Sequence, residues 1–219
     1  MDARAWDERY AGTDLVWSSG PNHFVESEVA GLRPGLALDL AAGEGRNAIW
    51  LAEQGWQVTA VDFSAVGLDK GRRVLAAHER ARDLHVDWVH HDVLTYDPGP
   101  VGHDLALLAY LQLPAEERRT AVRVGFAALA VGGHLVVVAH DSSNLAEGTG
   151  GPSDPAVLYT AEEILGDLDG EQFDVLRAER VERVVPAPAD DSAAAPADEH
   201  RGESDRVAYD ALVHLVRTA

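Results

Sequence analysis

The sequence has 219 residues, 46% of them hydrophobic, which suits a single domain with a sizeable core, and its lack of cysteine excludes disulfides and thiolate chemistry. Its net charge of −19, from 37 acidic and 18 basic residues, disfavours a nucleic-acid partner because phosphates repel a polyanion of the same sign. No apolar run approaches the roughly 20 residues that span a bilayer, and the charged start MDARAWDERY lacks a secretory core, so we expect a cytoplasmic protein without a membrane partner.

The first 34 residues form a lead-in to the main alternating pattern. A polar helix is expected near Ala3–Ala11, followed by the loop TDLVWSSGPN and a second helix near Phe24–Gly31. Trp17 lies in the Ser/Gly/Pro-rich loop, where neither a helical nor a strand period accounts for it.

Residues 35–141 alternate short apolar runs with amphipathic segments, a pattern that predicts a parallel sheet with helices on both faces. The expected strands are Leu36–Leu40, Val58–Val61, Val86–Val89, Asp104–Ala109 and His134–Ala139. The expected helices are Arg46–Gln54, Ala65–Arg82 and Ala115–Leu129, with Pro114 starting the last one and Gly132-Gly133 ending the connection that follows it.

Residues 142–219 complete the same domain. The glycine-rich loop DSSNLAEGTGGPSDPAVLYT is too long for an idle connection, so we expect it to form a wall of the site. Thr160 and Glu163 then form a capping-box pattern at the start of a helix, and the runs FDVLRAERVERVV and RVAYDALVHLVRT read as strands. The Pro-, Ala- and Asp-rich residues 186–205 between these strands are expected to form a mobile loop.

Two carboxylates mark a candidate ligand site. Asp39 interrupts the first apolar strand just before the turn Ala41-Ala42-Gly43-Glu44-Gly45, and Asp62 ends the second strand. Gly43 and Gly45 would let a ligand approach the main chain, and Asp62 would accept hydrogen bonds from the hydroxyls of a ribose. The pattern therefore predicts a nucleoside site at the carboxyl ends of these strands.

The charge of Asp39 distinguishes two nucleosides. The segment GEGRNA fits the glycine pattern of dinucleotide-binding enzymes, so an NAD-dependent oxidoreductase is one hypothesis. A carboxylate repels a pyrophosphate, however, and attracts the ammonium and sulfonium of S-adenosylmethionine, which favours the methyl donor. Alternatively, Asp39 only caps the turn that follows it.

Four segments together resemble the motifs of class I S-adenosylmethionine-dependent methyltransferases: LDLAAGEGRN, VTAVDFS, HHDV and GGHLVVVAH. The resemblance is greatest to the small-molecule branch that includes the tellurite-resistance and thiopurine-type enzymes, and covers about Gly35 to Asp141. It implies a doubly wound, Rossmann-like sheet of seven strands, mostly parallel with an antiparallel final strand. Ala41 departs from the family, which usually has glycine there.

The resemblance also implies the roles of individual residues towards S-adenosylmethionine. Asp39 would orient the ammonium, the turn of Ala41, Gly43 and Gly45 would line the methionine part, and Asp62 would bind the ribose. The adenine would contact Phe63, Asp92 and Val93, and the methyl group would lie beside Ala109 and Tyr110. Arg46 and Asn47 match the family's Arg-Asn pair, and Trp17 would belong to a lid over the donor or else pack the first helix onto the sheet.

The acceptor is expected to be a small molecule, methylated by in-line displacement. His140, Tyr110 and His23 are the candidates for a general base, although each histidine has a structural role as its alternative. His90 and His91 point to opposite faces of a strand, so no metal site is expected. A protein that binds S-adenosylmethionine without catalysis is a further hypothesis, and the sequence does not predict the oligomeric state.

Overall fold

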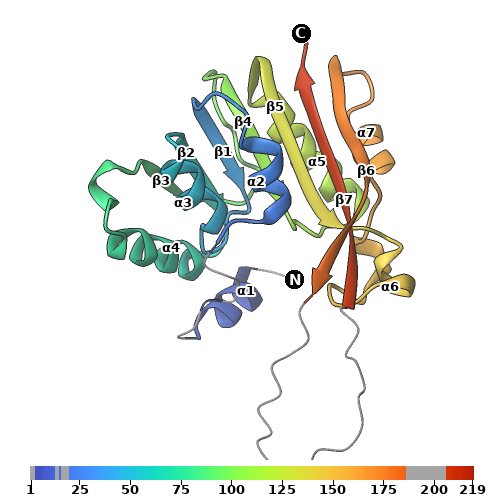
Figure 1. Cartoon of the computed structure of the whole chain (residues 1–219), viewed down its shortest axis with the longest axis horizontal. Coiled ribbons are helices and arrows are strands. Elements are labelled where there is room, and N and C mark those ends of the chain that lie inside the picture. Colours follow the sequence, from blue (N-terminus) through green and yellow to red (C-terminus); the bar gives the residue numbers. More distant parts are fainter. Residues whose placement is uncertain (1–2, 13–14, 16–19, 186–205) are drawn as a thin grey trace, which may run out of the picture.

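The computed structural model describes residues 3–12, 15, 20–185 and 206–219. Seven strands form one sheet in the order β3-β2-β1-β4-β5-β7-β6 (Figure 1). The strands are β1 (Leu36–Leu40), β2 (Gln57–Asp62), β3 (Val86–His90), β4 (His103–Ala109), β5 (Leu129–His140), β6 (Phe173–Val185) and β7 (Arg206–Arg217). The helices are α1 (Ala3–Tyr10), α2 (His23–Val29), α3 (Arg46–Glu53), α4 (Ala65–Ala77), α5 (Ala115–Ala127), α6 (Asn144–Glu147) and α7 (Ala161–Asp167).

Strands β1 to β5 are parallel, and the final strand β7 runs antiparallel to both β5 and β6. Parallel strands need crossovers, and the helices of those crossovers cover the two faces of the sheet. Helices α2 and α3 contribute to the apolar core on one face, while α5 and α7 contribute to the core on the other (Figure 1). The predicted fold class, a doubly wound and mostly parallel sheet with an antiparallel final strand, is confirmed.

The central strands lie within a residue of their predicted bounds because their apolar residues are buried on both faces. Strand β5 is longer than predicted: it begins at Leu129, so Gly132 and Gly133 lie inside it instead of ending the connection. The register of its pairing with β4 shifts between His103 and Leu105, and a Cβ on Gly133 would lie 2.6 Å from the His103 carbonyl oxygen. Two glycines thus permit an irregular strand, not a turn.

Helix α4 is shorter than the predicted span Ala65–Arg82. It ends at Ala77, His78 takes an extended conformation, and a 3-10 turn over Ala81–Asp83 follows. The capping box of Thr160 and Glu163 at the start of α7 is present as predicted.

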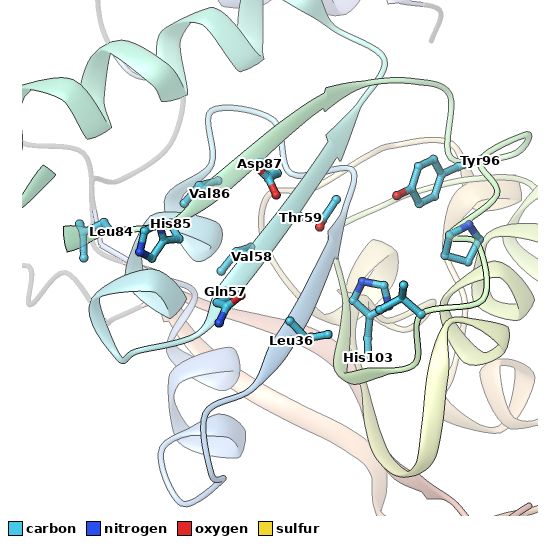
Figure 2. A pocket seen from close by; sticks show the side chains of 12 residues that line it. Leu36, Gln57, Val58, Thr59, Leu84, His85, Val86, Asp87, Tyr96 and His103 are labelled. Atoms are coloured by element: carbon cyan, nitrogen blue, oxygen red, sulfur yellow. The ribbon is translucent and has the colours of Figure 1, made fainter. Parts of the chain in front are cut away.

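The crossover from β3 to β4, residues 91–102, contains no helix. A hollow of about 490 Å³ remains where this loop passes the sheet, lined near the amino ends of β1 to β4 by Leu36, Gln57, Val86 and His103 among others (Figure 2). This hollow lies at the opposite strand ends from Asp39 and Asp62, so it is separate from the predicted ligand site. Among the described residues, no helix is both long enough and apolar enough to cross a membrane.

Candidate functional site

Asp39 lies at the point where strand order reverses, because β1 pairs with β2 on one side and with β4 on the other. Its carboxylate is almost fully buried, and Oδ2 has no hydrogen-bond partner among the described residues. Burial and the neighbouring charge of Asp62 raise the pKa of Asp39 to about 7, against the opposing effects of Arg46 and the Ala48 N–H. A buried carboxylate oxygen without a donor is costly, so this atom is suited to a ligand that brings a positive charge or a donor.

Asp62 ends β2 and holds the backbone of the glycine turn. Its Oδ2 accepts from the Gly43 N–H at 2.8 Å, and its Oδ1 accepts from the Ser64 N–H at 2.7 Å. Burial raises the pKa of Asp62 despite these two hydrogen bonds. Each carboxylate oxygen retains a second lone pair, so the carboxylate can also accept from the hydroxyls of a ligand.

The turn after β1 has a left-handed backbone at three positions: Ala41 (φ 60°), Gly43 (φ 57°) and Gly45 (φ 75°). Side chains of the protein fill the space beside both glycines. A Cβ on Gly43 would lie 2.6 Å from the Tyr10 hydroxyl, and a Cβ on Gly45 would lie 2.3 Å from the Trp88 ring. Glycine is therefore required at these positions by packing and conformation, in addition to any ligand approach.

Helix α1 docks on the same turn, a contact that the sequence analysis missed. The Asp7 carboxylate accepts from the Ser64 hydroxyl at 2.5 Å and from the Val66 N–H at 3.3 Å, and thereby caps the start of α4. Tyr10, 4% exposed, packs with its ring against Gly67. The spacing of Asp7 and Tyr10 on one helical face was the available signal, but their partners lie more than thirty positions away in sequence.

Arg46 and Asn47 begin α3 and face different neighbours. Arg46 is partly buried, which lowers the pKa of its guanidinium although Tyr110 and Asp39 both raise it. The Asn47 side chain accepts from the Asn22 N–H at 2.8 Å. Asn47 therefore fixes the lead-in to α3, while Arg46 interacts electrostatically with Asp39 and Tyr110.

The residues predicted to contact adenine follow β2 and β3. Phe63 is partly exposed, and its carbonyl oxygen lies 2.9 Å from Nε2 of His90. Asp92 is exposed, and its Oδ1 accepts from the Leu94 N–H at 2.9 Å, so one oxygen caps a turn. Val93 is buried in the core, which leaves only its backbone for a ligand.

Four side chains gather at the ends of β4 and β5. Tyr110, which has a left-handed φ of 59°, donates to Oδ2 of Asp210 at 2.7 Å. The His140 ring lies 4.8 Å from the Tyr110 ring, and its Nδ1 is 3.2 Å from Asp210 Oδ1. Arg183 donates to Asp210 at 2.8 Å. The structure thus brings together Tyr110 and His140, two of the candidate bases, around two residues that the sequence analysis missed.

The remaining predictions lie apart from this cluster. His23 is exposed at the start of α2 and stacks on Phe24, and no contact within the described residues joins it to His140 or Tyr110. Ala109 is partly buried at the end of β4, next to Tyr110. Trp17 and the predicted mobile loop 186–205 lie outside the described residues. The part of the chain that is described contains no group of three or more side chains that could hold a metal ion.

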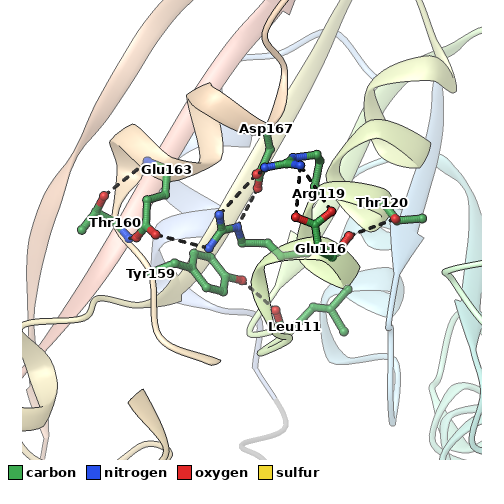
Figure 3. A network of polar contacts seen from close by, with 9 residues as sticks. Leu111, Glu116, Arg119, Thr120, Tyr159, Thr160, Glu163 and Asp167 are labelled. Atoms are coloured by element: carbon green, nitrogen blue, oxygen red, sulfur yellow. Dashed lines mark hydrogen bonds and ion pairs between the residues drawn. The ribbon is translucent and has the colours of Figure 1, made fainter. Parts of the chain in front are cut away.

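A buried polar network holds the loop after β5 against the site (Figure 3). Arg118 of α5 binds Asp167 of α7 through two hydrogen bonds of 2.6 and 3.2 Å. The Arg118 guanidinium lies 4.8 Å from the centre of the Tyr159 ring, and the Tyr159 hydroxyl donates to the Leu111 carbonyl at 2.6 Å. The network thus connects α5 and α7 to the segment that follows Tyr110.

Residues 37–133 match a family described as a methyltransferase domain. Over 76 residues the chain is 42% identical to the demethylmenaquinone methyltransferase of Clavibacter sepedonicus. That match covers 35% of this chain and 29% of the relative, so it spans less than a third of that enzyme's length.

Solved structures with the same fold cover nearly the whole chain. TehB from Haemophilus influenzae aligns over 97% of this chain and 66% of its own, with a TM-score of 0.65 and 14% identity. The N-methyltransferase NodS from Bradyrhizobium japonicum, crystallised with S-adenosylhomocysteine, aligns over 100% of both chains with a TM-score of 0.65 and 17% identity. A protein of echinomycin biosynthesis, described for the conversion of a disulfide bond into a thioacetal group, aligns over 99% of this chain and 92% of its own, with a TM-score of 0.69 and 18% identity.

Proposed function

We propose that this chain, whose residues 37–133 match the methyltransferase-domain family, transfers a methyl group from S-adenosylmethionine to a small molecule. The match agrees with the predicted class I resemblance. The observation that carries the proposal is the buried Oδ2 of Asp39 beside the glycine turn, which has no hydrogen-bond partner in the described part of the chain. A cationic donor would supply the positive charge that this carboxylate lacks.

The residues around the turn fit S-adenosylmethionine. Asp39 would face the ammonium, directly or through water, and Asp62 would accept from the ribose hydroxyls with its remaining lone pairs. The partly exposed Phe63 and the exposed Asp92 would contact the adenine, and Ala109 would lie beside the methyl group. Bound there, the donor supplies an electrophilic methyl group on a sulfonium.

The same charges oppose NAD, the rival ligand. A pyrophosphate in the turn would lie near two buried carboxylates, and burial would weaken the screening of that repulsion. Arg46 adds one positive charge near the turn, but it already interacts with Asp39 and Tyr110. The family match supports the methyl donor over the dinucleotide as well.

A small-molecule acceptor is supported by the solved relatives, whose descriptions include NodS and a magnesium protoporphyrin IX methyltransferase from Synechocystis. The net charge of −19 supports the same proposal because it disfavours nucleic acid. In-line transfer depends on the alignment of acceptor, methyl and sulfur, and this alignment can lower the activation free energy by about 7–11 kcal/mol. His140 and Tyr110, at the ends of β5 and β4, would flank the acceptor. The cytoplasmic location remains a prediction.

Calorimetry with S-adenosylmethionine, S-adenosylhomocysteine and NAD tests the donor, and we expect the first two to bind and NAD not to bind. Binding of NAD alone would overturn the proposal. Transfer of a labelled methyl group to a panel of phenols, alcohols, amines, thiols and metalloid oxyanions tests catalysis. Donor binding with no transfer to any acceptor would instead support a non-catalytic protein.

A further inference from the structure

Asp210 is the centre of the cluster at the acceptor side. It belongs to β7, is fully buried, and contacts side chains from three other parts of the sheet. Its Oδ2 accepts from the Tyr110 hydroxyl at 2.7 Å and from Arg183 Nε at 2.8 Å. These two donors fix the carboxylate and leave its Oδ1 for His140.

Asp210 Oδ1 and His140 Nδ1 lie 3.2 Å apart, and both atoms are buried. Neither forms a well-aligned hydrogen bond with any described residue, so their contact with each other is the polar contact that the structure gives both atoms. If Nδ1 carried no proton, two acceptors would face one another in a buried site, which is unfavourable. A proton on Nδ1 and a small rotation of the ring satisfy both atoms.

The charges around the ring favour this arrangement. Burial raises the pKa of Asp210, but the contacts with His140 and Arg183 bring that pKa below its usual value. The carboxylate is therefore ionised. Burial and the Asp210 charge raise the pKa of the Tyr110 hydroxyl, so Tyr110 keeps its proton and donates it. From α3, Arg46 adds a positive charge near Tyr110 and Arg183. Among the described residues, Asp210 is the carboxylate whose contact with the imidazole the structure shows.

The ring of His140 is also held from outside the cluster. A Cβ on Gly151 would lie 3.0 Å from three ring atoms, so the loop after β5 packs directly on the imidazole. The backbone N–H of His140 donates to Gln112 Oε1 at 2.9 Å, and Gln112 Nε2 in turn donates to the Val157 carbonyl. These contacts restrict the ring, and Nε2 makes no hydrogen bond to the described residues.

We propose that Asp210 is a positioning residue that keeps His140 protonated on Nδ1, so that Nε2 can act as a general base towards a hydroxyl acceptor. The inference rests on the proposed function, since it assigns the acceptor class of the same site. It goes beyond the family resemblance, which provides no carboxylate on β7.

A hydroxyl is the acceptor that needs such a base. The hydroxyl of an alcohol or a phenol is protonated at neutral pH, and loss of its proton during attack requires a group that accepts it. A neutral amine attacks with its own lone pair, a thiol is already partly ionised, and an oxyanion carries no proton on the attacking atom. An ammonium has no lone pair and must lose its proton before it attacks, so a base that accepts the proton during the attack fits a hydroxyl best.

The step balances without any further reactant. The hydroxyl oxygen forms a bond to the methyl carbon while the carbon–sulfur bond breaks, and that electron pair stays on sulfur to give the neutral thioether of S-adenosylhomocysteine. The hydroxyl proton passes to Nε2 of His140. Asp210 then stabilises the imidazolium through its short contact with Nδ1.

The tautomer of His140 can be measured without knowledge of the acceptor. Nitrogen chemical shifts of the imidazole, recorded with S-adenosylhomocysteine bound and assigned by comparison with His140→Gln, should show a proton on Nδ1 in the wild type. Asp210→Asn offers an amide donor to Nδ1, so we expect the proton on Nε2 in that variant. The control Asp141→Asn changes the neighbouring buried carboxylate, which binds Ser143 and not the imidazole, and should keep the wild-type tautomer. A wild-type proton on Nε2 would overturn the proposal, even if Asp210→Asn does not fold.

Labelled methyl transfer tests the acceptor class. With phenols that are protonated at the assay pH, Asp210→Asn should lower kcat on the order of 10²–10⁴-fold with an unchanged Kd for the donor. With phenols that are already ionised, the loss should shrink to under about tenfold, since no proton has to leave. An equal loss for both kinds of phenol, or wild-type transfer only to thiols or amines, would overturn the proposal. Failure of the proposed function is distinguishable, because neither S-adenosylmethionine nor S-adenosylhomocysteine would then bind.

Discussion

Asp62 ties the glycine turn to β2, because its Oδ2 accepts a hydrogen bond of 2.8 Å from the Gly43 N–H. A residue expected to bind the ribose therefore also fixes the loop that lines the donor. Asp62 would thus both shape the donor site before the donor binds and contact the bound donor. Its substitution should therefore have two separable effects.

Asp62→Ala should weaken the binding of S-adenosylmethionine by at least tenfold, since each charge-assisted hydrogen bond contributes about 1.5–3 kcal/mol. It should also lower the free energy of unfolding, because the buried Gly43 and Ser64 N–H groups each lose an acceptor at a cost of about 1–3 kcal/mol. Calorimetry and denaturant unfolding measure the two effects. Asp62→Asn, which keeps one acceptor oxygen, should lie between the wild type and Asp62→Ala in stability, and an unchanged Kd in both variants would contradict the ribose assignment.

Asp39 gives donor binding a pH dependence. Its pKa is raised from 3.8 to about 7, so its carboxyl is largely protonated in the free protein at pH 6. A cationic donor favours the ionised form, so binding should release a proton below pH 7, and affinity should rise with pH until it levels above pH 7. Calorimetry in buffers of different ionisation enthalpy measures the released proton.

Asp39→Asn is the control for this titration, and its affinity should be weaker and independent of pH over the same range. Its stability provides a second readout. A raised carboxyl pKa contributes stability below the unfolded value, and that contribution is lost as the pH rises through about 7. The stability of Asp39→Asn relative to the wild type should therefore increase between pH 4 and pH 7. A constant difference would show that Asp39 is ionised throughout.

The residues proposed for the donor side were easier to find from the sequence than those proposed for the acceptor side, because their partners lie closer in sequence. Asp39, Gly43 and Asp62 lie in one strand–turn–helix–strand unit, so their proximity follows from local pattern. Asp210 contacts Tyr110 from a hundred positions away, and only the pairing of β5 with β7 places it beside His140. Asp210 nevertheless interrupts the apolar run RVAYDALVHLVRT, and a carboxylate within an apolar run is the same signal that marked Asp39.

The fold was predictable to the extent that burial decided it. Strands β1 and β4 are buried on both faces, and mostly apolar runs marked them closely. The predicted start of β5 was wrong because Gly132 and Gly133 are typical of turns. In the structure, pairing with β4 overrides that preference. The sheet order itself required tertiary contacts that no local pattern encodes.

Ala41 has a left-handed backbone that its Cβ disfavours by about 1–2 kcal/mol. Ala41→Gly should relieve that strain and raise the free energy of unfolding by about 1 kcal/mol, after the greater entropy of glycine in the unfolded chain is subtracted. Thermal unfolding should show a Tm increase of about 2–4 °C for a chain of this size. The neighbouring Ala42 has no positive φ, so Ala42→Gly should lower stability instead. Equal effects at the two positions would contradict the strain.

Gly45 should tolerate no side chain because Trp88 occupies the space. In Gly45→Ala the new Cβ would lie 2.3 Å from the Trp88 ring at a φ of 75°, so overpacking and backbone strain should together lower stability by about 2–5 kcal/mol. Gly132→Ala is a matched control, since φ is 87° there but nothing lies within 4 Å, and only the strain of about 1–2 kcal/mol should remain. Adding Trp88→Leu to Gly45→Ala should recover part of the loss. Denaturant unfolding of the four proteins measures this, and an equal loss at both glycines would rule out the clash.

The buried pair of Arg118 and Asp167 should be stabilising only as a pair. Their side chains are 7% and 2% exposed, so Arg118→Met would leave Asp167 buried with only Arg119 at 3.6 Å, at a cost of about 3–5 kcal/mol. The double variant Arg118→Met, Asp167→Leu removes both charges and should recover most of that loss, because the desolvation cost disappears with them. The network also supports Tyr159 and its hydrogen bond to Leu111, so Arg118→Met alone should loosen the loop after β5. Hydrogen exchange over residues 141–160 should then increase. Additive losses in the double variant would mean that the two side chains act independently, in conflict with their bidentate contact.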